Sequence, residues 1–257
     1  MSRRLDERSG PWVAEHLTAD SVVVVPTGAI EHHGPHLPLA TDRIMAEAVA
    51  AAAVERAAAA GVDAWLLPSL AYTKSDEHAW APGTMWLSAE TFHATLVDLG
   101  RAIAATPARR VVFLNGHGGN VAPLGVALRE LRRRFGLQTF FTGIRVPPGD
   151  GDEGGDELGM GIHGGHGETS LLLHLRPDLV DLAAAERAVP EHLLDTPMIG
   201  FAGTPVTFGW LSDDFGSGGV IGDPTRANAA HGAALFEASV DQAARALGEV
   251  ARFRAAQ

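Results

Sequence analysis

The chain has 257 residues, and its 31 acidic side chains outnumber its 20 lysines and arginines, which gives a formal net charge of −11. This balance argues against a nucleic-acid partner, which needs a basic face, and the absence of cysteine excludes disulfides, thiolate zinc sites and cysteine nucleophiles. We expect residues 1–257 to form one α/β domain.

Strand-like and helix-like segments alternate along the chain. β-branched runs predict buried strands and alanine-rich stretches predict helices. Gly61 is placed to end the first long helix, Ser88 is an expected N-cap, and Pro68 puts its strand at an edge or a bulge. In chain order we predict a strand at 22–25, a helix at 42–60, a strand at 64–72, a helix at 88–105, a strand at 110–114, a helix at 123–135, a strand at 139–144, and helices at 168–175 and 226–254. This order favours a mostly parallel sheet with helices on both faces.

Two stretches interrupt the alternation. Residues 147–161 are rich in Gly, Asp and Glu, and we expect a solvated loop there. They do not match a calcium-binding EF-hand, because Gly154 takes a ligand position and the distal glutamate is missing. Residues 200–224 combine glycine, aspartate and aromatic residues and predict an irregular lobe near the site.

No membrane or export segment is expected. The longest apolar run, residues 48–54, is far shorter than the roughly 20 residues that span a bilayer. The arginine-containing start lacks the apolar stretch of a secretory signal. We therefore expect a soluble, cytoplasmic protein without a membrane partner.

Histidines gather where functional sites of open α/β sheets form, at loops after predicted strands. The clustered ones are His32, His33, His36, His117, His163 and His166. In the segment EHHGPHLPLATD, Glu31 and His33 are two residues apart and leave an extended backbone on the same face. Asp42 closes the segment and can fold back toward them. This ligand mixture suits zinc, manganese or iron(II) rather than calcium; the alternative is a helix-capping Asp42 with structural histidines.

Two later motifs add to this pattern. In NGHGGN, glycines on both sides of His117 allow a sharp turn, and the lysine of a phosphate-binding loop is missing. The alternative is a turn histidine bonded to a carbonyl. In HGGHGETS, Glu168 opens a helix and could serve as a ligand or as a cap. His163 or His166 could act as general acid or base, because imidazole titrates near neutrality.

Together, the motifs E-x-H-G-P-H-L-P-L-x-T-D, N-G-H-G-G-N, H-x-G-x-x-E-T-S and G-V-I-G-D-P-T resemble the creatininase family of metal-dependent amidohydrolases. The resemblance runs from about Val22 to the last helix. It implies a three-layer α/β/α sandwich, a binuclear metal site, and hydrolysis of a non-peptidic or cyclic C–N amide bond. It also implies a homo-oligomer, often a hexamer.

The resemblance also implies roles for particular residues. Glu31 and His117 would hold one ion, His33 would hold the other, and Asp42 would bridge them. The two ions would be Zn²⁺ and/or Mn²⁺, with Fe²⁺ as an alternative. Sharing Asp42, they would lower the pKa of a bound water and polarise the substrate carbonyl.

The remaining positions partly depart from the family pattern. Creatininase has a metal-binding glutamate where this chain has Gly119, so Glu168 becomes the proposed replacement. His163 matches the histidine that handles protons near the scissile nitrogen. Ser75 matches a substrate-contacting serine, and His78 is a second predicted substrate-binding residue.

Further positions concern the substrate pocket. Glu77 is expected to border it, and Trp80, Trp86, Trp210 and Phe215 are expected to wall it. Residues 158–162 read LGMGI where creatininase has a Trp-Asp pair, and His166 replaces an acidic residue. Both departures argue against creatinine itself as the substrate. The roles of His32, His36 and the 147–161 loop stay open.

The leading hypothesis is a hydrolase for a small cyclic amide, formamide or related amide. Within the family, the alternatives are trimming of a peptide cofactor precursor and removal of formyl groups. A different class is a non-catalytic oligomeric binding module, which the intact set of five ligands disfavours. A binuclear phosphoesterase is disfavoured because only Arg43 and Lys74 lie close to the motifs as basic phosphate contacts.

Overall fold

A four-stranded parallel sheet forms the centre of the computed structural model, which describes residues 2–150, 156–201, 203–216 and 218–254. The strand order is β2-β1-β3-β4, with β1 Val22–Thr27, β2 Ala64–Leu66, β3 Arg110–Asn115 and β4 Gln138–Gly143. Val22 of β1 pairs with Ala64 on one side and with Arg110 on the other, in parallel register.

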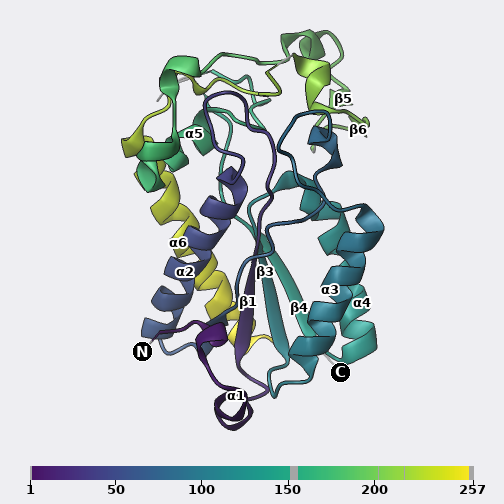
Figure 1. Cartoon of the computed structure of the whole chain (residues 1–257), viewed down its shortest axis with the longest axis vertical. Helices are drawn as coiled ribbons and strands as arrows, with labels where there is room; N and C mark the ends of the chain where they lie inside the picture. The colour runs from purple at the N-terminus through teal and green to yellow at the C-terminus, as the bar shows by residue number, and fades with distance from the viewer. Residues whose placement is uncertain (1, 151–155, 202, 217, 255–257) are drawn as a thin grey trace.

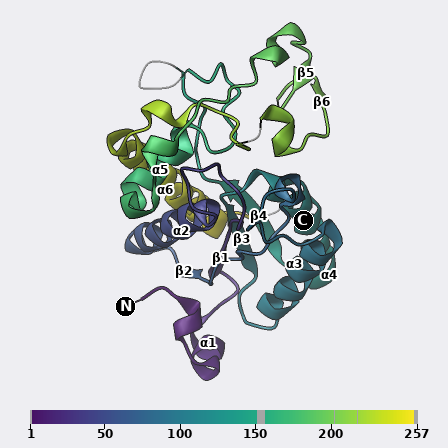
Figure 2. The same ribbon diagram turned by 45° about the horizontal axis from the view of Figure 1, so that its top comes forward.

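Helices cover both faces of this sheet (Figure 1). One face carries α2 (Thr41–Ala59) and α6 (Ala229–Arg252), with α5 (His166–Leu175) packed against them. The other face carries α3 (Ala89–Ala104) and α4 (Val121–Phe135). The short helix α1 (Gly10–His16) lies below the sheet, and the strand pair β5 (Ile199–Gly200) and β6 (Val206–Thr207) lies in the upper lobe (Figure 2).

Alternation along β1 divides the core into two layers, because successive side chains of a strand point to opposite faces. Val23 and Val25 pack with Phe92 of α3 and Leu124 of α4. Val22 and Val24 pack in the second layer, with α2 and α6. All six residues of β1 and all six of β3 are buried, as expected for central strands of a parallel sheet.

The predicted elements are confirmed in kind and order, including the N-cap at Ser88, whose hydroxyl accepts from the Thr91 amide. The strand predicted over 64–72 is too long, because β2 ends at Leu66. Pro68 has no N–H to donate, and strand pairing resumes only as an isolated bridge at Leu70. The edge position of β2 is confirmed, and there the Leu66 amide donates to the Arg3 carbonyl at 2.9 Å.

The prediction of a solvated loop at 147–161 is wrong for Glu157, which is 1% exposed. Residues 151–155 of that loop, including Gly154, lie outside the described residues. None of the helices in the described part of the chain is both long and apolar enough to cross a membrane.

Candidate metal centre

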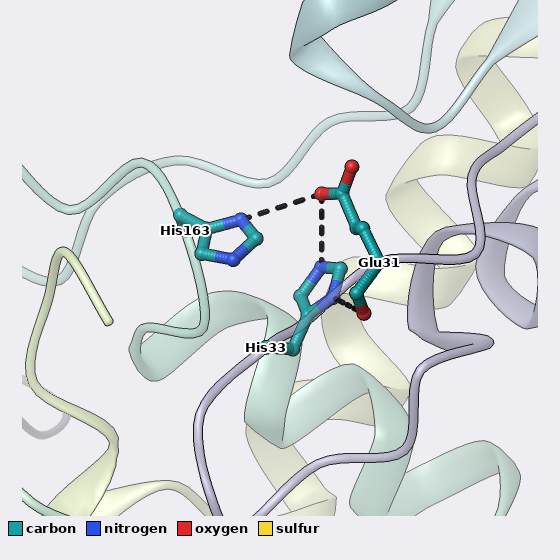
Figure 3. A group of neighbouring side chains, drawn as sticks. All are labelled: Glu31, His33 and His163. Carbon is teal, nitrogen blue, oxygen red and sulfur yellow. Dashed lines mark hydrogen bonds and ion pairs between the residues drawn. The ribbon is translucent and has the colours of Figure 1, made fainter. Parts of the chain in front are cut away.

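The candidate ligands come from three chain segments that meet above the carboxyl ends of the central strands. Glu31 and His33 follow β1, and Asp42 lies in the first turn of α2. His117 follows β3, and Glu168 lies in the first turn of α5. Figure 3 shows Glu31 and His33 converging with His163, which comes from the segment before α5. The structure therefore brings all five predicted ligands and the predicted proton-handling histidine into one buried region.

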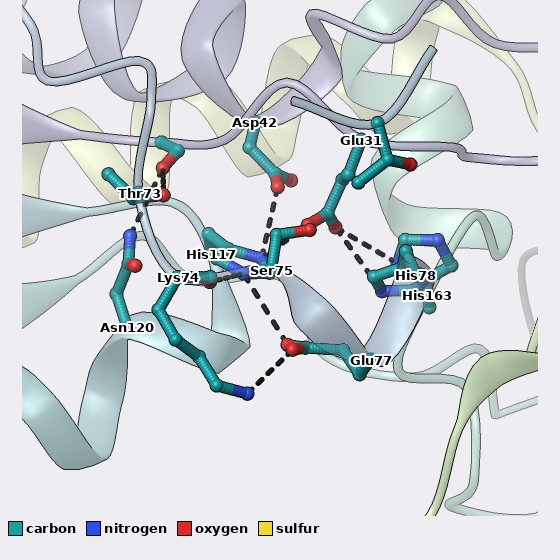
Figure 4. A network of polar contacts seen from close by, with 12 residues as sticks. Glu31, Asp42, Thr73, Lys74, Ser75, Glu77, His78, His117, Asn120 and His163 are labelled. Carbon is teal, nitrogen blue, oxygen red and sulfur yellow. Dashed lines mark hydrogen bonds and ion pairs between the residues drawn. The ribbon is translucent and has the colours of Figure 1, made fainter. Parts of the chain in front are cut away.

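A buried hydrogen-bond network fixes the strand ends beneath this region, and Figure 4 shows its members Asn120 and Thr73 beside His117. Thr27 at the end of β1 donates to Asn115 Oδ1 at 2.9 Å, and Asn115 Nδ2 donates to the His117 carbonyl at 2.6 Å. Asn120 and Thr73 both donate to the Gly28 carbonyl, at 3.1 Å and 2.6 Å. Sequence analysis missed these roles, although Asn115 and Asn120 are the first and last residues of the NGHGGN motif. The network ties His117 to the exit of β1.

Glu31, Asp42 and His117 form one group of candidate ligands. His117 Nδ1 lies 3.2 Å from Glu31 Oε2 and 3.2 Å from Asp42 Oδ2. The other ring nitrogen, Nε2, is 2.8 Å from the Lys74 carbonyl, so Nε2 donates to that carbonyl and Nδ1 is the atom that faces the carboxylates. Metal-bound histidines usually donate their outward ring nitrogen to such a carbonyl.

His33, Asp42 and Glu168 form a second group. His33 Nε2 lies 3.2 Å from Asp42 Oδ1 and 3.9 Å from Glu168 Oε2. His33 Nδ1 is 3.1 Å from the Glu31 carbonyl, so Nδ1 donates outward and Nε2 is the nitrogen that faces the carboxylates. Asp42 thus turns one oxygen toward each imidazole, the arrangement expected of a carboxylate that bridges two ions.

The electrostatics of these groups fit a cation. Burial opposes charge on His33, but the carboxylates of Asp42 and Glu31 outweigh it and raise the pKa of His33 to about 10. The pKa of His117 is raised well above its usual value by Glu31 and Asp42, against the effect of burial. Burial raises the pKa of Glu168 to about 7. Three carboxyl groups thus share one largely buried space, where unpaired charge costs several kcal/mol.

Two carboxylate oxygens support this fit directly. Glu31 Oε1 and Asp42 Oδ2 are buried and have no hydrogen-bond partner. A buried acceptor that lacks a donor is unfavourable, and a divalent ion between these oxygens would satisfy it. The residues present therefore fit a divalent-metal centre.

His163 and His78 stand beside this centre as a stacked pair, with ring centroids 4.1 Å apart. His163 Nε2 is 2.7 Å from the His32 carbonyl, and its Nδ1 lies 3.6 Å from Glu31 Oε1. Burial and the neighbouring His33 hold the pKa of His163 well below its usual value. His78 Nε2 lies 3.5 Å from the same Glu31 oxygen, and burial lowers the pKa of His78.

Ser75, the other predicted substrate contact, is fully buried. Its hydroxyl donates to Glu31 Oε2 at 2.5 Å. In this structure the hydroxyl therefore orients a candidate ligand, and a contact with substrate stays a prediction.

Glu77, which was expected to border the substrate pocket, lies directly beside a candidate ligand. Its Oε1 is 3.5 Å from His117 Nε2, and its Oε2 accepts from Lys74 Nζ at 2.6 Å. A Cβ built on Gly119 would collide with this carboxylate and with His117. A side chain at position 119 therefore has no room, which supports Glu168 as the ligand in its place.

Glu157 is a buried residue that sequence analysis missed. Its carboxylate accepts from the amides of Gly149 at 2.5 Å, His166 at 2.9 Å and Asp223 at 2.7 Å. These amides belong to three different segments, one of which carries His163 toward α5. No local pattern signals this role, because the donors come from separate segments, one of them 66 residues away in sequence.

Three other histidines hold loops together. His32 Nε2 is 2.9 Å from the Gly218 carbonyl. His36 Nε2 lies 3.1 Å from the Gly164 carbonyl and 3.0 Å from Thr169 Oγ1. His166 packs on His231, with ring centroids 4.8 Å apart. None of the three belongs to a candidate ligand group among the described residues.

The four aromatic residues predicted to wall the pocket fall into separate environments. Trp80 donates to Ser212 Oγ at 2.7 Å and packs edge-on against His32. Trp210 and Phe215 pack against each other in the upper lobe, with ring centroids 6.0 Å apart. Trp86 is 44% exposed. Through His32, Trp80 contacts a segment that carries candidate ligands.

Known proteins are similar to this chain in sequence and in fold. Residues 6–247 match the family model Creatininase, described as creatinine amidohydrolase. The chain is 37% identical to the mycofactocin precursor peptide peptidase of Mycolicibacterium smegmatis, over 86% of this chain and 81% of that protein. It is also 37% identical to creatinine amidohydrolase of Pseudomonas putida, over 66% of this chain and 70% of that protein. A solved structure described as "Creatininase Mn" has a TM-score of 0.73 at 29% identity and covers 97% of this chain and 98% of its own.

Proposed function

The chain belongs to the creatininase family of amidohydrolases, and we propose that it cleaves the C–N amide bond of a peptide, using two divalent ions held by Glu31, His33, Asp42, His117 and Glu168. The match to a peptide peptidase extends over a larger share of the chain than the match to creatinine amidohydrolase, which supports the peptide substrate. A small cyclic amide is the second candidate, supported by the match to creatinine amidohydrolase.

The observation that carries the binuclear proposal is the division of the Asp42 carboxylate. Oδ2 faces His117 and Oδ1 faces His33, each at 3.2 Å. Glu31 would complete one ion site and Glu168 the other. Imidazole with carboxylate suits Zn²⁺ or Mn²⁺, with Fe²⁺ as an alternative.

Two divalent ions, when bound, supply a Lewis acid for the substrate carbonyl and lower the pKa of a water molecule. His163 handles the proton. It begins neutral, because burial lowers its pKa, and its Nε2 is engaged with the His32 carbonyl. Nδ1 therefore takes the proton of the attacking water and passes it to the departing nitrogen. His78 stacks on His163, so a positive charge on both rings at once is unfavourable. The pair therefore holds at most one extra proton at a time.

A cavity of about 310 Å³ on the segment directly before His163 supports a substrate with an apolar group. Leu158, Met160, Leu193, Ile199 and Phe201 are among its lining residues. Creatininase carries its Trp-Asp pair in the corresponding stretch, so this chain replaces a bulky contact with open apolar space. An apolar side chain of a peptide is the occupant that this lining suits.

The cytoplasmic location and the homo-oligomer, as a hexamer, are part of the proposal. Tyr72, Met85 and Trp86 are exposed large side chains, and burying them between copies would favour association. Light scattering of the purified chain measures the oligomer number directly.

The test is hydrolysis by metal-reconstituted protein of three substrate sets: short peptides, cyclic amides including creatinine, and formamides. We expect new amino termini from peptides, loss of activity with a chelator, and recovery when metal is returned. Activity on cyclic amides alone would favour the second candidate. Protein that carries two ions and hydrolyses none of the sets would favour the non-catalytic binding module.

A further inference from the structure

Glu31, His33 and Asp42 form a triangle in which each pair of residues is completed by a different partner. Glu31 and Asp42 are completed by His117, and His33 and Asp42 by Glu168. These are the two ion positions of the proposed function, on which the present inference rests. The third pair, Glu31 and His33, is completed by His163, and this position has no assigned role.

The third position has the geometry of a metal site (Figure 3). Glu31 Oε1 lies 3.8 Å from His33 Nε2 and 3.6 Å from His163 Nδ1. Ligand atoms around a tetrahedral zinc lie about 3.3–3.5 Å apart, given metal–ligand bonds of about 2.0–2.1 Å. All three ligand atoms lie within 4.8 Å of one another, so a modest contraction would bring them onto one ion. All three residues are buried, and none is more than 5% exposed.

The hydrogen bonds of these three residues also leave their ligand atoms facing the proposed ion position. Glu31 Oε1 has no hydrogen-bond partner. His33 and His163 each donate the proton of the outward nitrogen to a backbone carbonyl, of Glu31 and His32 respectively. Their inward nitrogens therefore face the same carboxylate oxygen, and His33 would coordinate an ion after losing its second proton. Outward hydrogen bonds of this kind orient metal-bound histidines.

His33 Nε2 has a single lone pair, so it can serve only one ion at a time. We propose that the second ion has two alternative positions, one held by His33, Asp42 and Glu168 and the other by Glu31, His33 and His163. The first ion is compatible with either, because Glu31 offers it Oε2 and keeps Oε1 for the alternative position. In the alternative position His163 Nδ1 is a ligand and cannot accept a proton, so this form of the enzyme is inactive.

The choice between the positions depends on the metal. The Asp42–Glu168 position offers two carboxylates and one imidazole, whereas the alternative offers one carboxylate and two imidazoles. Mn²⁺ favours oxygen ligands and Zn²⁺ accepts imidazole readily. Manganese is therefore expected in the active arrangement, and zinc is expected to populate the inactive one.

Counting bound ions in variants tests the proposal without an activity assay. Metal-free protein is loaded with zinc, freed of excess metal, and analysed by elemental mass spectrometry. We expect two ions per chain in the wild type, in Glu168→Gln and in His163→Gln, because each variant keeps one of the alternatives. The double variant Glu168→Gln/His163→Gln loses both and should keep one ion. The control Glu168→Gln/His78→Gln, which alters the stacked neighbour, should keep two.

Several outcomes would overturn the inference. One ion in Glu168→Gln, or two in Glu168→Gln/His163→Gln, would contradict an alternative position that uses His163. Fewer than two ions in the wild type would instead contradict the proposed function, so the two failures can be told apart.

X-ray absorption of the wild type gives a second measurement that does not depend on the folding of variants. The zinc form should show three imidazoles shared by two ions, and the manganese form should show two. Equal imidazole numbers in the two forms would overturn the dependence on metal.

Discussion

Glu77 occupies the space that the absent side chain of Gly119 leaves open. The carboxylate sits where a Cβ on residue 119 would stand, and its Oε1 lies 3.5 Å from His117 Nε2. Lys74 holds it there by an ion pair at 2.6 Å and accepts the His117 proton through its own carbonyl. Gly119 and the Glu77 carboxylate therefore act together to fix the orientation of the His117 ring.

Gly119→Ala should disturb this unit. The new Cβ would collide with Glu77, His117 and the Lys74 carbonyl, so the His117 ring must move. We expect metal affinity to fall by roughly 10–100-fold, the range that is typical when the contacts orienting a metal ligand are lost. Gly118→Ala is the matched control, because a Cβ there has no atom within 4 Å. The affinities are measured by competition with a chelating dye. Equal affinities in the two variants would contradict a role for the space at Gly119 in positioning His117.

Asp42→Ala and His33→Ala should differ in metal content. Asp42 faces both imidazoles, so its loss should leave less than one tightly held ion per chain. His33→Ala should retain about one ion, because Glu31, Asp42 and His117 keep their geometry. Elemental analysis after gel filtration measures both variants. Equal retention in the two would argue against a bridging Asp42.

The metal-free protein should lose stability as pH rises above neutrality. The pKa of His33 is raised to about 10, so its contribution is fully present below its usual 6.5 and is lost as pH approaches 10. Below about pH 6.5 the lowered pKa values of His163 and His78 act in the opposite direction, because these buried histidines gain a proton on unfolding. Urea unfolding of chelated protein should therefore show falling stability from about pH 7 to 10. Metal-loaded protein should show a much flatter profile over this range, because bound imidazoles are already neutral; a rising profile there in chelated protein would contradict the assignment.

His163→Gln should separate catalysis from manganese binding. Its role as proton carrier predicts a fall in kcat of about 10²–10⁴-fold, the usual contribution of general acid–base catalysis. The manganese content should stay at the wild-type value, because neither proposed position for the active arrangement uses His163. Unchanged kcat with full metal content would remove His163 from the mechanism.

Glu157→Ala should destabilise the segment that carries His163. Three backbone amides, from Gly149, His166 and Asp223, would lose their acceptor in a buried space. The expected cost is about 1–3 kcal/mol for each buried donor left unsatisfied. Asp156→Asn is the control from the same loop, since Asp156 is exposed. Chemical denaturation that gives the two variants equal stability would contradict a structural role for Glu157.

The fold was largely predictable because its signals are local. The strand at 22–25 and the helix that begins after Ser88 follow from residues that lie within a few positions of one another. The family and the α/β sandwich are confirmed by the comparisons and by the parallel sheet. The length of β2 was overestimated, since a proline in an apolar run weakens pairing without changing its hydropathy.

For the candidate site, the sequence predicted some residues and could not predict others. The motifs gave the positions of the five ligands through resemblance to a family, and their roles stay predictions that metal analysis can test. Glu157 was missed because its burial depends on amides from His166 and Asp223, which no local composition reveals. The close fit of Glu77 against Gly119 likewise exists only in three dimensions.

The short edge strand has a consequence for how copies of this chain can meet. β2 is only three residues long, the Leu66 amide is already bonded to the Arg3 carbonyl, and Pro68 comes two residues later. A neighbouring molecule therefore finds almost no free backbone there on which to add a strand. Any assembly that approaches from this side must be built from side-chain contacts of helices and loops, and continuous sheets running from one molecule into the next are blocked along that border.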